Sequence, residues 1–422
     1  MKKILLSFAV ALLCSAGTQA QRHRTCSTHE KYLQAISMDP SILEQRSVLE
    51  QQTQEWVANN ASQRSNGTNT VLVTIPVVVH VLYQNATQNI SDAQILSQIE
   101  VLNADYAHRN ADSTITPAAF QPLMANTQIQ FCMASTDPSG NLTNGIERRQ
   151  VSVSQIGNTS KYYQYSQGGL AAWNRNSYLN FWICDIDGGW TLGFAYLPGT
   201  AGAAYDGVVI DYNFFGTIGT AQAPFNLGRT ATHEVGHYLN LEHIWADESA
   251  CNADDGVTDT PQQKGENYGC PSYPQTSQSG GRCNASDPSS MFMNYMDYTD
   301  DACMAMFTPG QGTRMQAGVA SGRPGLLTSI GCSVPTSILS PGGKIGLTIY
   351  PNPSAGEFEF TTGFINSQTE IQVTDIAGRV VLEKTFMPGD RLSFDLTQSP
   401  AGSYFVDVKA DGHREVKQVT KF

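Results

Sequence analysis

The larger, N-terminal part of the chain alternates between apolar runs and helical patterns. Residues 71–83 are nearly all β-branched or apolar, which is typical of a strand buried on both faces. Further strands are predicted at 127–134 and 178–185, and a helix is predicted near 227–239. This order of strands and helices indicates an α/β or α+β domain.

The clearest helix start lies just after the first strand. Ser91 can serve as its N-cap, and Gln94 can complete a capping box. Ile90 and Ile95 have the spacing of a hydrophobic staple, which sets the direction in which the chain enters the helix.

The pattern changes near the C-terminus. Residues 333–346 form a linker rich in Pro, Gly and Ser, and residues 347–422 contain short alternating runs separated by turn residues. The predicted strands are 357–361, 370–374, 380–385, 391–396 and 403–409. Short strands at this spacing predict a small all-β sandwich domain.

The N-terminus has the features of an export signal. Two lysines precede an apolar stretch, 4–13, that is too short to span a bilayer, and we expect a signal peptide, 1–20, cleaved after Ala20. No later stretch is long and apolar enough to predict a transmembrane segment. A helical stretch is expected at 41–56, and the polar tract 59–70 is expected to be an exposed, cleavable linker.

The composition excludes some functions. The formal net charge is -12 and the pI is about 5.1, with no basic stripe that could neutralise phosphates, so we expect no nucleic-acid partner. Hydrophobic residues make up 41% of the chain, which is typical of a folded globular protein.

The cysteines point to disulfides. Loss of Cys14 with the signal peptide leaves eight of the nine cysteines, and an even number in an exported protein suggests pairing. Four of them lie in the loop-like stretch 251–303, which has little core of its own and would be ordered by cross-links. The alternative, a zinc site of four thiolates, lacks any C-x-x-C pair.

Three histidines give the strongest chemical signal. His233 and His237 are four residues apart on the predicted helix, so both imidazoles can reach one tetrahedral zinc ion. Glu234 is too angled to share the metal easily but can hold and deprotonate a zinc-bound water. Asn240 can adopt a left-handed turn that brings His243 round as a third ligand. The alternative is an amphipathic helix with chance histidines.

The same segment supports a resemblance to a known family. It has the form H-E-x-x-H-x-x-N-x-x-H, which resembles the long zinc motif of the metzincins except for Asn in place of Gly. Residues 294–298, Asn-Tyr-Met-Asp-Tyr, resemble the Met-turn of the pappalysin (cytophagalysin-like) metalloproteases, and the region 179–199 also resembles that family. The resemblance implies a metzincin-like catalytic domain at 65–332.

The resemblance also implies roles for individual residues. His233, His237 and His243 would bind zinc, and Glu234 would be the general base. Met296 would form the apolar floor beneath the metal, although alone it would be taken as a core residue. Tyr298 would stabilise the oxyanion, a role that suits a phenol donor near a metal; the alternative is a core tyrosine.

Calcium and disulfides are implied in the acidic loop after the zinc helix. Its carboxylates and carbonyls suit calcium, although the EF-hand pattern does not fit, and a solvated acidic loop is the alternative. By resemblance, the candidate calcium ligands are Asp255, Thr258, Asp259 and Thr260. The resemblance also suggests the disulfides Cys251–Cys283 and Cys270–Cys303 and leaves the pairing of Cys132, Cys184 and Cys332 open.

A latency device is expected near the mature N-terminus. Residues 24–28, Arg-Thr-Cys-Ser-Thr, resemble the cysteine segment of pappalysin propeptides. The Cys26 thiolate can take the fourth zinc position and exclude water, which would make residues 21–64 an inhibitory propeptide released when the linker is cut. This hypothesis predicts a second unpaired cysteine; the alternative is a disulfide at Cys26.

The C-terminal domain has a resemblance of its own. Residues 349–354, 375–380 and 400–404 resemble segments of the C-terminal sorting domain of type IX secretion substrates. This implies the type IX secretion machinery as a partner and a secreted location, extracellular or on the outer-membrane surface of a Gram-negative bacterium. A carbohydrate- or cell-binding module is the alternative.

These features predict a secreted zinc-dependent endopeptidase made as a zymogen. It would hydrolyse protein or peptide substrates through a zinc-bound water activated by Glu234. Asp300 and Asp301 follow the Met-turn, where metzincins shape their specificity pocket, and predict a preference for Arg or Lys just after the scissile bond. The alternative is a non-catalytic cell-surface binding protein that retains a structural metal site.

Overall fold

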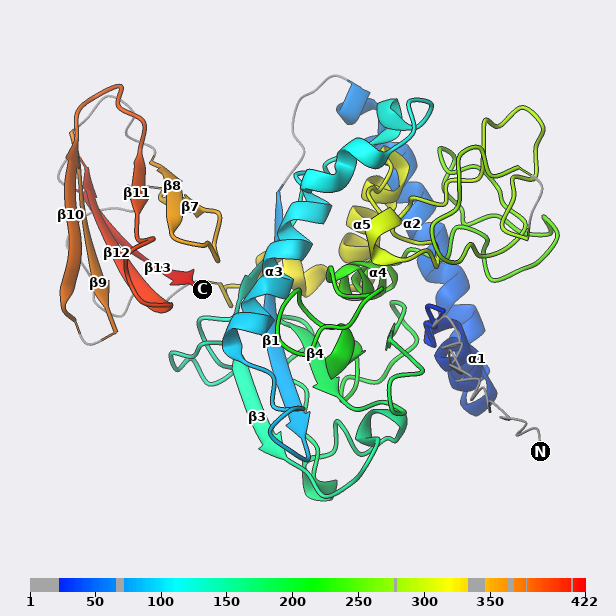
Figure 1. Cartoon of the computed structure of the whole chain (residues 1–422), viewed down its shortest axis with the longest axis horizontal. Helices are drawn as coiled ribbons and strands as arrows, with labels where there is room; N and C mark the ends of the chain where they lie inside the picture. Colours follow the sequence, from blue (N-terminus) through cyan, green and yellow to red (C-terminus); the bar gives the residue numbers. More distant parts are fainter. Residues whose placement is uncertain are drawn as a thin grey trace, which may run out of the picture.

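The computed structural model describes residues 23–65, 72–276, 279–332, 346–362, 368–376, 378–410 and 413–422. The predicted signal peptide and nearly all of the predicted linker at 333–346 lie outside the described residues. Figure 1 shows a larger α/β domain and a smaller all-β domain, as the sequence predicts. None of the helices in the described part of the chain has the length and apolar character that a membrane span requires.

A six-stranded sheet forms the centre of the larger domain. Its order is β2-β1-β4-β6-β5, and β3 also pairs with β1. The strands are β1 (Val73–Tyr83), β2 (Ile129–Met133), β3 (Ile146–Gln150), β4 (Leu179–Cys184), β5 (Gly193–Ala195) and β6 (Val208–Asp211). Neighbouring strands are parallel except for β5, which runs antiparallel to β6 at one edge. The three predicted strands of this domain are thereby confirmed.

Three helices share one hydrophobic core with this sheet (Figure 1). They are α3 (Asp92–Tyr106), α4 (Arg229–Tyr238) and α5 (Pro309–Gly322). Because α4 packs against β5 and β6, its histidine-bearing turns lie next to the antiparallel edge of the sheet.

The start of α3 differs in one detail from its prediction. Ser91 accepts a hydrogen bond from the Gln94 N–H, and Ile90 and Ile95 are buried as expected. However, the Gln94 side chain does not close the capping box. Its amide instead donates to the Phe215 carbonyl, because the loop that follows β6 packs over this helix end.

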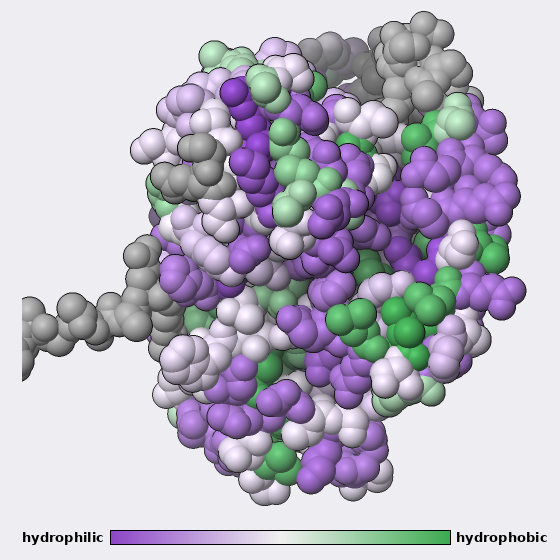
Figure 2. Space-filling view, turned by 90° about the vertical axis from the view of Figure 1, so that its right-hand side faces the viewer, coloured by the Kyte–Doolittle hydropathy of each residue, from purple (hydrophilic) through white to green (hydrophobic). Residues whose placement is uncertain are grey.

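Two N-terminal helices lie on the outside of the larger domain. Helix α1 (Thr28–Met38) packs near β5. Helix α2 (Ser41–Ser65) packs against α5 (Figure 1). Figure 2 views the molecule from this side, where hydrophobic residues form only small groups in a mostly hydrophilic surface. The predicted linker at 59–70 is wrong for 59–65, because these polar residues extend a helix that is already nucleated. Residues 66–71 lie outside the described residues.

Three disulfides tie the larger domain together. Cys251 pairs with Cys283 and Cys270 with Cys303, as the resemblance suggests, and Cys132 pairs with Cys332. Among the cysteines that the structure describes, Cys26 and Cys184 are free and buried. Cys184 is therefore the second unpaired cysteine that a free Cys26 requires.

The C-terminal domain is a sandwich of two antiparallel sheets with a common apolar core. The sheets have the orders β10-β9-β12-β13 and β11-β8-β7. Their strands are β7 (Thr348–Tyr350), β8 (Glu357–Thr361), β9 (Thr369–Asp375), β10 (Val380–Phe386), β11 (Ser393–Asp395), β12 (Gly402–Ala410) and β13 (His413–Lys421). The five predicted strands are present. Two strands were not predicted: β7, which is short, and β13, a polar edge strand that gains its conformation by pairing with β12.

Candidate active site

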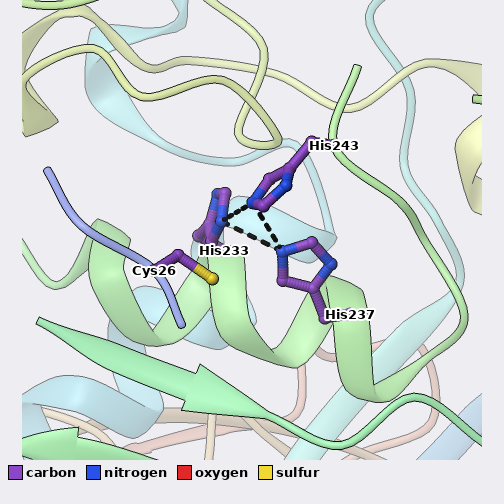
Figure 3. A group of neighbouring side chains, drawn as sticks. All are labelled: Cys26, His233, His237 and His243. Atoms are coloured by element: carbon purple, nitrogen blue, oxygen red, sulfur yellow. Dashed lines mark hydrogen bonds between the residues drawn. The ribbon is translucent and has the colours of Figure 1, made fainter. Parts of the chain in front are cut away.

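Helix α4 carries two of the three histidines, and the chain turns sharply after the helix to bring back the third. His233 and His237 lie one turn apart on the helix (Figure 3). Asn240 follows with φ of 79°, and the N–H groups of the turn bond back to carbonyls in the last helical turn. This is a Schellman arrangement with Asn at the left-handed position, and it brings His243 to the other two rings.

The Nε2 atoms of the three histidines converge on one point. They lie 3.0, 3.2 and 3.2 Å from one another, and all three side chains are buried. A tetrahedral zinc ion with Zn–N distances of about 2.0–2.1 Å would place its nitrogen ligands about 3.3 Å apart. The spacing of the rings therefore fits this ion.

The outer nitrogens of the rings show which tautomer is present. His233 Nδ1 lies 2.7 Å from the Tyr295 carbonyl, His237 Nδ1 lies 2.8 Å from the Leu241 carbonyl, and His243 Nδ1 lies 2.5 Å from the Asp247 carboxylate. All three partners are acceptors, so each Nδ1 carries the hydrogen and each Nε2 presents a lone pair. Burial lowers the pKa of His237 to about 3, which keeps that ring neutral. Three converging lone pairs with no donor between them require a cation.

A buried carboxylate lies beside the histidines. Glu234 Oε2 accepts hydrogen bonds from the Thr28 hydroxyl at 3.0 Å and the Cys26 thiol at 3.3 Å. Burial raises the pKa of Glu234 to about 7. The Cys26 sulfur and the histidine nitrogens all lie within 4.8 Å of one another, and Figure 3 shows this sulfur facing the rings.

The N-terminal segment lies along the edge strand β5. Ser27 N–H donates to the Gly193 carbonyl at 3.1 Å, and Leu192 N–H donates to the Thr25 carbonyl at 3.0 Å. The bridge between Cys26 and Gly193 is parallel. The segment therefore occupies an edge to which an extended peptide substrate could add.

The Arg24 side chain is buried at the start of α4. Its guanidinium donates to Asp301 Oδ1 at 2.6 Å and to the Thr299 carbonyl at 3.2 Å, and the Arg24 and Asp301 side chains are 1% and 0% exposed. The Phe225 ring centroid lies 5.1 Å from the guanidinium carbon. Of the two residues predicted to line the specificity pocket, Asp301 is buried and pairs with the Arg24 guanidinium. Asp300 is only partly buried.

The two predicted Met-turn residues flank the histidines on different sides. Met296 is fully buried, and a Cβ on Gly236 would lie 2.5 Å from its sulfur, so the methionine packs closely against α4. The Tyr298 ring centroid lies 4.8 Å from that of His243. The Tyr298 hydroxyl donates to the Cys26 carbonyl at 3.2 Å.

The predicted calcium ligands do not share one centre. Asp255 accepts from the Thr260 hydroxyl, Thr258 is exposed, and Asp259 accepts from the Thr308 hydroxyl at the start of α5. Burial raises the pKa of Asp255 to about 8. Within the described ranges, the histidine site with Cys26 is the one group of three or more Cys, His or acidic residues close enough to hold an ion together.

Three residues that contribute to this site were not predicted from the sequence. Arg24 and Thr28 flank Cys26 in the segment that was singled out, but no role was assigned to either residue. Asp247, in the acidic loop, was also given no role, although it follows His243 by four residues. That spacing was the available signal for a carboxylate partner of the third histidine.

Comparisons with known proteins match this geometry. A family described as pregnancy-associated plasma protein-A, a peptidase family, matches residues 165–320, and a secretion system C-terminal sorting domain matches 348–421. An extracellular metalloprotease of Colletotrichum graminicola is 31% identical over 74% of this chain and 95% of its own length. The chain belongs to the pappalysin family of metalloproteases. This membership confirms a secreted zinc metalloendopeptidase and sets aside the non-catalytic binding protein.

Two solved structures resemble this pappalysin over most of their own length. Mature mirolysin of Tannerella forsythia, in complex with a cleaved peptide, is 46% identical, covers 61% of this chain and 97% of its own, and has a TM-score of 0.57. A promirolysin mutant of the same organism is 42% identical, covers 72% of this chain and 97% of its own, and has a TM-score of 0.60. The proenzyme neighbour supports a zymogen, and the sorting domain indicates a secreted or surface location.

Proposed function

We propose that this pappalysin hydrolyses peptide bonds with Glu234 as the general base, at a zinc ion held by His233, His237 and His243. The observation that carries the proposal is the convergence of three Nε2 lone pairs beside a buried carboxylate whose pKa is about 7. When bound, zinc polarises a carbonyl and lowers the pKa of water.

The residues of the chain perform the proton transfers. Glu234 takes a proton from the attacking water and later delivers it to the leaving amine. Tyr298, whose hydroxyl binds the Cys26 carbonyl in this structure, donates to the oxyanion of the substrate. Met296 supports α4 from below and takes no part in the chemistry.

Replacing Glu234 tests this assignment. In the activated enzyme, Glu234→Gln should lower kcat on a peptide by at least about 10²–10⁴-fold, which is the usual contribution of a general base. Zinc per chain should stay at the wild-type value, because Glu234 is not a ligand. Glu248→Gln, at an exposed glutamate beyond the third histidine, is the matched control and should have wild-type kcat. Wild-type turnover by Glu234→Gln would remove it from the mechanism.

Latency is assigned to residues 21–64, with Cys26 as the switch. Support comes from the Cys26 sulfur facing the three histidines and from the pairing of this segment with β5. The Cys26 thiolate would occupy the fourth zinc position and exclude water from Glu234. Thiol counting on the native zymogen and on the cut and released propeptide tests the switch: the Cys26 thiol should be unreactive in the zymogen and reactive after release, and equal reactivity in both would refute it.

Substrate preference is assigned to Asp301. The pocket above it accepts the Arg24 side chain of the propeptide, so the same pocket should accept Arg or Lys of a substrate just after the scissile bond. The Arg24 guanidinium donates from three nitrogens to three separate acceptors, Asp301 Oδ1, the Thr299 carbonyl and the Thr230 hydroxyl, a planar arrangement that favours Arg over Lys. A cleavage profile over a peptide library tests this, and a profile without basic residues at that position would reject it.

Two finer assignments complete the proposal. Calcium binding by the acidic loop is supported by the density of carboxylates in this loop; an ion would have to bring Asp255 and Asp259, which have separate partners here, to one centre. The sorting domain would direct the protein through the type IX machinery across a Gram-negative outer membrane. Deletion of residues 346–422 should leave the enzyme inside the cell envelope, and unchanged export of the truncated chain would contradict this.

A further inference from the structure

Asn240 makes a second set of contacts that the zinc site does not need. Its Oδ1 accepts a hydrogen bond from Arg46 Nη1 at 2.7 Å, and its Nδ2 donates to Thr53 Oγ1 at 3.3 Å. Asn240 and Thr53 are fully buried, and Arg46 is 7% exposed. The side chain of the turn between the second and third histidines is therefore bound by helix α2 of the propeptide.

The backbone of the same residue joins a second contact to α2. The Asn240 carbonyl accepts from Arg314 Nε at 3.0 Å. The two Nη atoms of Arg314 donate to the two carboxylate oxygens of Glu50, both at 2.7 Å. Because Arg314 is on α5, the turn, α5 and α2 are held in one network.

The residues of α2 in this network lie on one face of the helix. Arg46, Glu50 and Thr53 have the spacing i, i+4 and i+7, which places them in a row. Leu49 packs between them against the domain, where a Cβ on Gly322 would approach its methyl group to 3.1 Å. We call the set Arg46, Glu50, Thr53, Asn240 and Arg314 the α2 latch.

The α2 latch is separate from the contacts made by the cysteine segment. Residues 24–28 bind β5, Glu234 and Asp301. Helix α2 instead binds the turn at Asn240 and lies beside α5 (Figure 1). A cut between residues 64 and 65, where the proposed propeptide ends, or at 66–71 lies well beyond Thr53 and breaks none of these contacts. Covalent separation alone therefore leaves the propeptide held at two places.

We propose that Asn240 and Arg314 form a docking surface for α2, which retains the excised propeptide on the enzyme, so that its release and not the cut itself completes activation. This rests on the proposed division of the chain into propeptide and catalytic domain. The proposal also explains why residue 240 is Asn and not Gly. Gly would adopt φ of 79° at less steric cost, but it has no side chain to bind Arg46 or Thr53.

The test uses the full chain with Glu234→Ala, which prevents self-digestion, and with a recognition sequence for a site-specific protease placed at 66–71. After cutting, the parent chain should keep its propeptide during size-exclusion chromatography. Asn240→Gly should speed dissociation about 10- to 100-fold, because it removes a buried hydrogen bond to a charged group. Arg46→Ala, which lies outside the metal site, should give a similar change.

The two substitutions should also be non-additive. The double variant should release the propeptide about as fast as the faster single variant, because both remove the same contact. Gln51→Ala, at an exposed position of α2, should release at the parent rate. If Arg46→Ala releases no faster than Gln51→Ala, the docking surface is refuted. The readout is release of the propeptide and not turnover, and all variants share one background, so this outcome does not bear on whether Glu234 is the general base.

Discussion

The ion pair between Arg24 and Asp301 joins latency to specificity, so its loss should affect both. Arg24→Ala would leave the Asp301 carboxylate buried without a cationic partner, although the N–H groups of Leu227 and Arg229 would still donate to it. Breaking a buried pair costs about 3–5 kcal/mol. Because two N–H donors remain, we take the lower end of this range, about 3 kcal/mol. This corresponds to an about 100-fold smaller equilibrium constant for binding of the N-terminal segment over the active site.

The assay is the rate at which purified zymogen activates itself. Cutting requires the N-terminal segment to leave the cleft, so the rate should rise with the open fraction, about 100-fold in Arg24→Ala. The rate of self-activation should rise less in Arg24→Lys, because the lysine ammonium keeps the charge but lacks the planar, forked geometry of the guanidinium. Arg379→Ala removes an exposed ion pair to Asp375 in the sorting domain and should have no effect.

The same pair predicts a change in the mature enzyme. Asp301→Asn should lower kcat/KM for peptides with Arg after the scissile bond by about 100-fold relative to peptides with Leu there, since the neutral amide leaves the guanidinium unpaired in a buried pocket. Wild-type latency of Arg24→Ala, together with an unaltered cleavage profile of Asp301→Asn, would refute this reasoning.

Three further predictions concern single residues. Tyr298→Phe keeps the ring against His243 but removes the hydroxyl, so kcat should fall about 10²–10³-fold with KM nearly unchanged; a change in KM alone would contradict an oxyanion role. Asp247→Asn weakens the acceptor that orients His243, so zinc affinity, measured by competition with a chromogenic chelator, should fall about 10- to 100-fold; equal affinities would show that the carboxylate does not matter. Burial raises the pKa of Asp255 from 3.8 to about 8, so the folded zymogen holds a proton that the unfolded chain releases, and stability should fall as pH rises through that window in calcium-free buffer. Asp255→Asn should flatten this dependence of the thermal midpoint, and excess calcium should raise the wild-type midpoint at the alkaline end; parallel profiles in both proteins would contradict the shift.

The elements predicted correctly are those whose signal is local. The apolar run at 73–83 and the Ser91 cap of α3 need no distant partner to be recognised. The prediction failed where polar sequence took its conformation from a neighbour. Residues 59–65 extend a helix that docks on α5, and β13 is ordered by pairing with β12.

Candidate site residues divide in the same way. The zinc histidines and Glu234 lie within eleven residues of one another, so helical spacing and one left-handed turn suffice to bring them together. The contacts of Arg24 with Asp301 and of Cys26 with Glu234 span 277 and 208 residues. At such separations, the spacing of residues in the sequence does not predict which carboxylate a propeptide side chain contacts.

By itself, therefore, the sequence determined the order of strands and helices, the histidine geometry, and the turn residue that delivers His243. Only the tertiary structure decided that Asn240 also binds α2, that Asp301 and not Asp300 receives Arg24, and that Asp259 serves the start of α5. The physical reason is that backbone periodicity governs neighbours within a few residues, whereas a buried polar group is satisfied by whatever partner the packed chain places beside it.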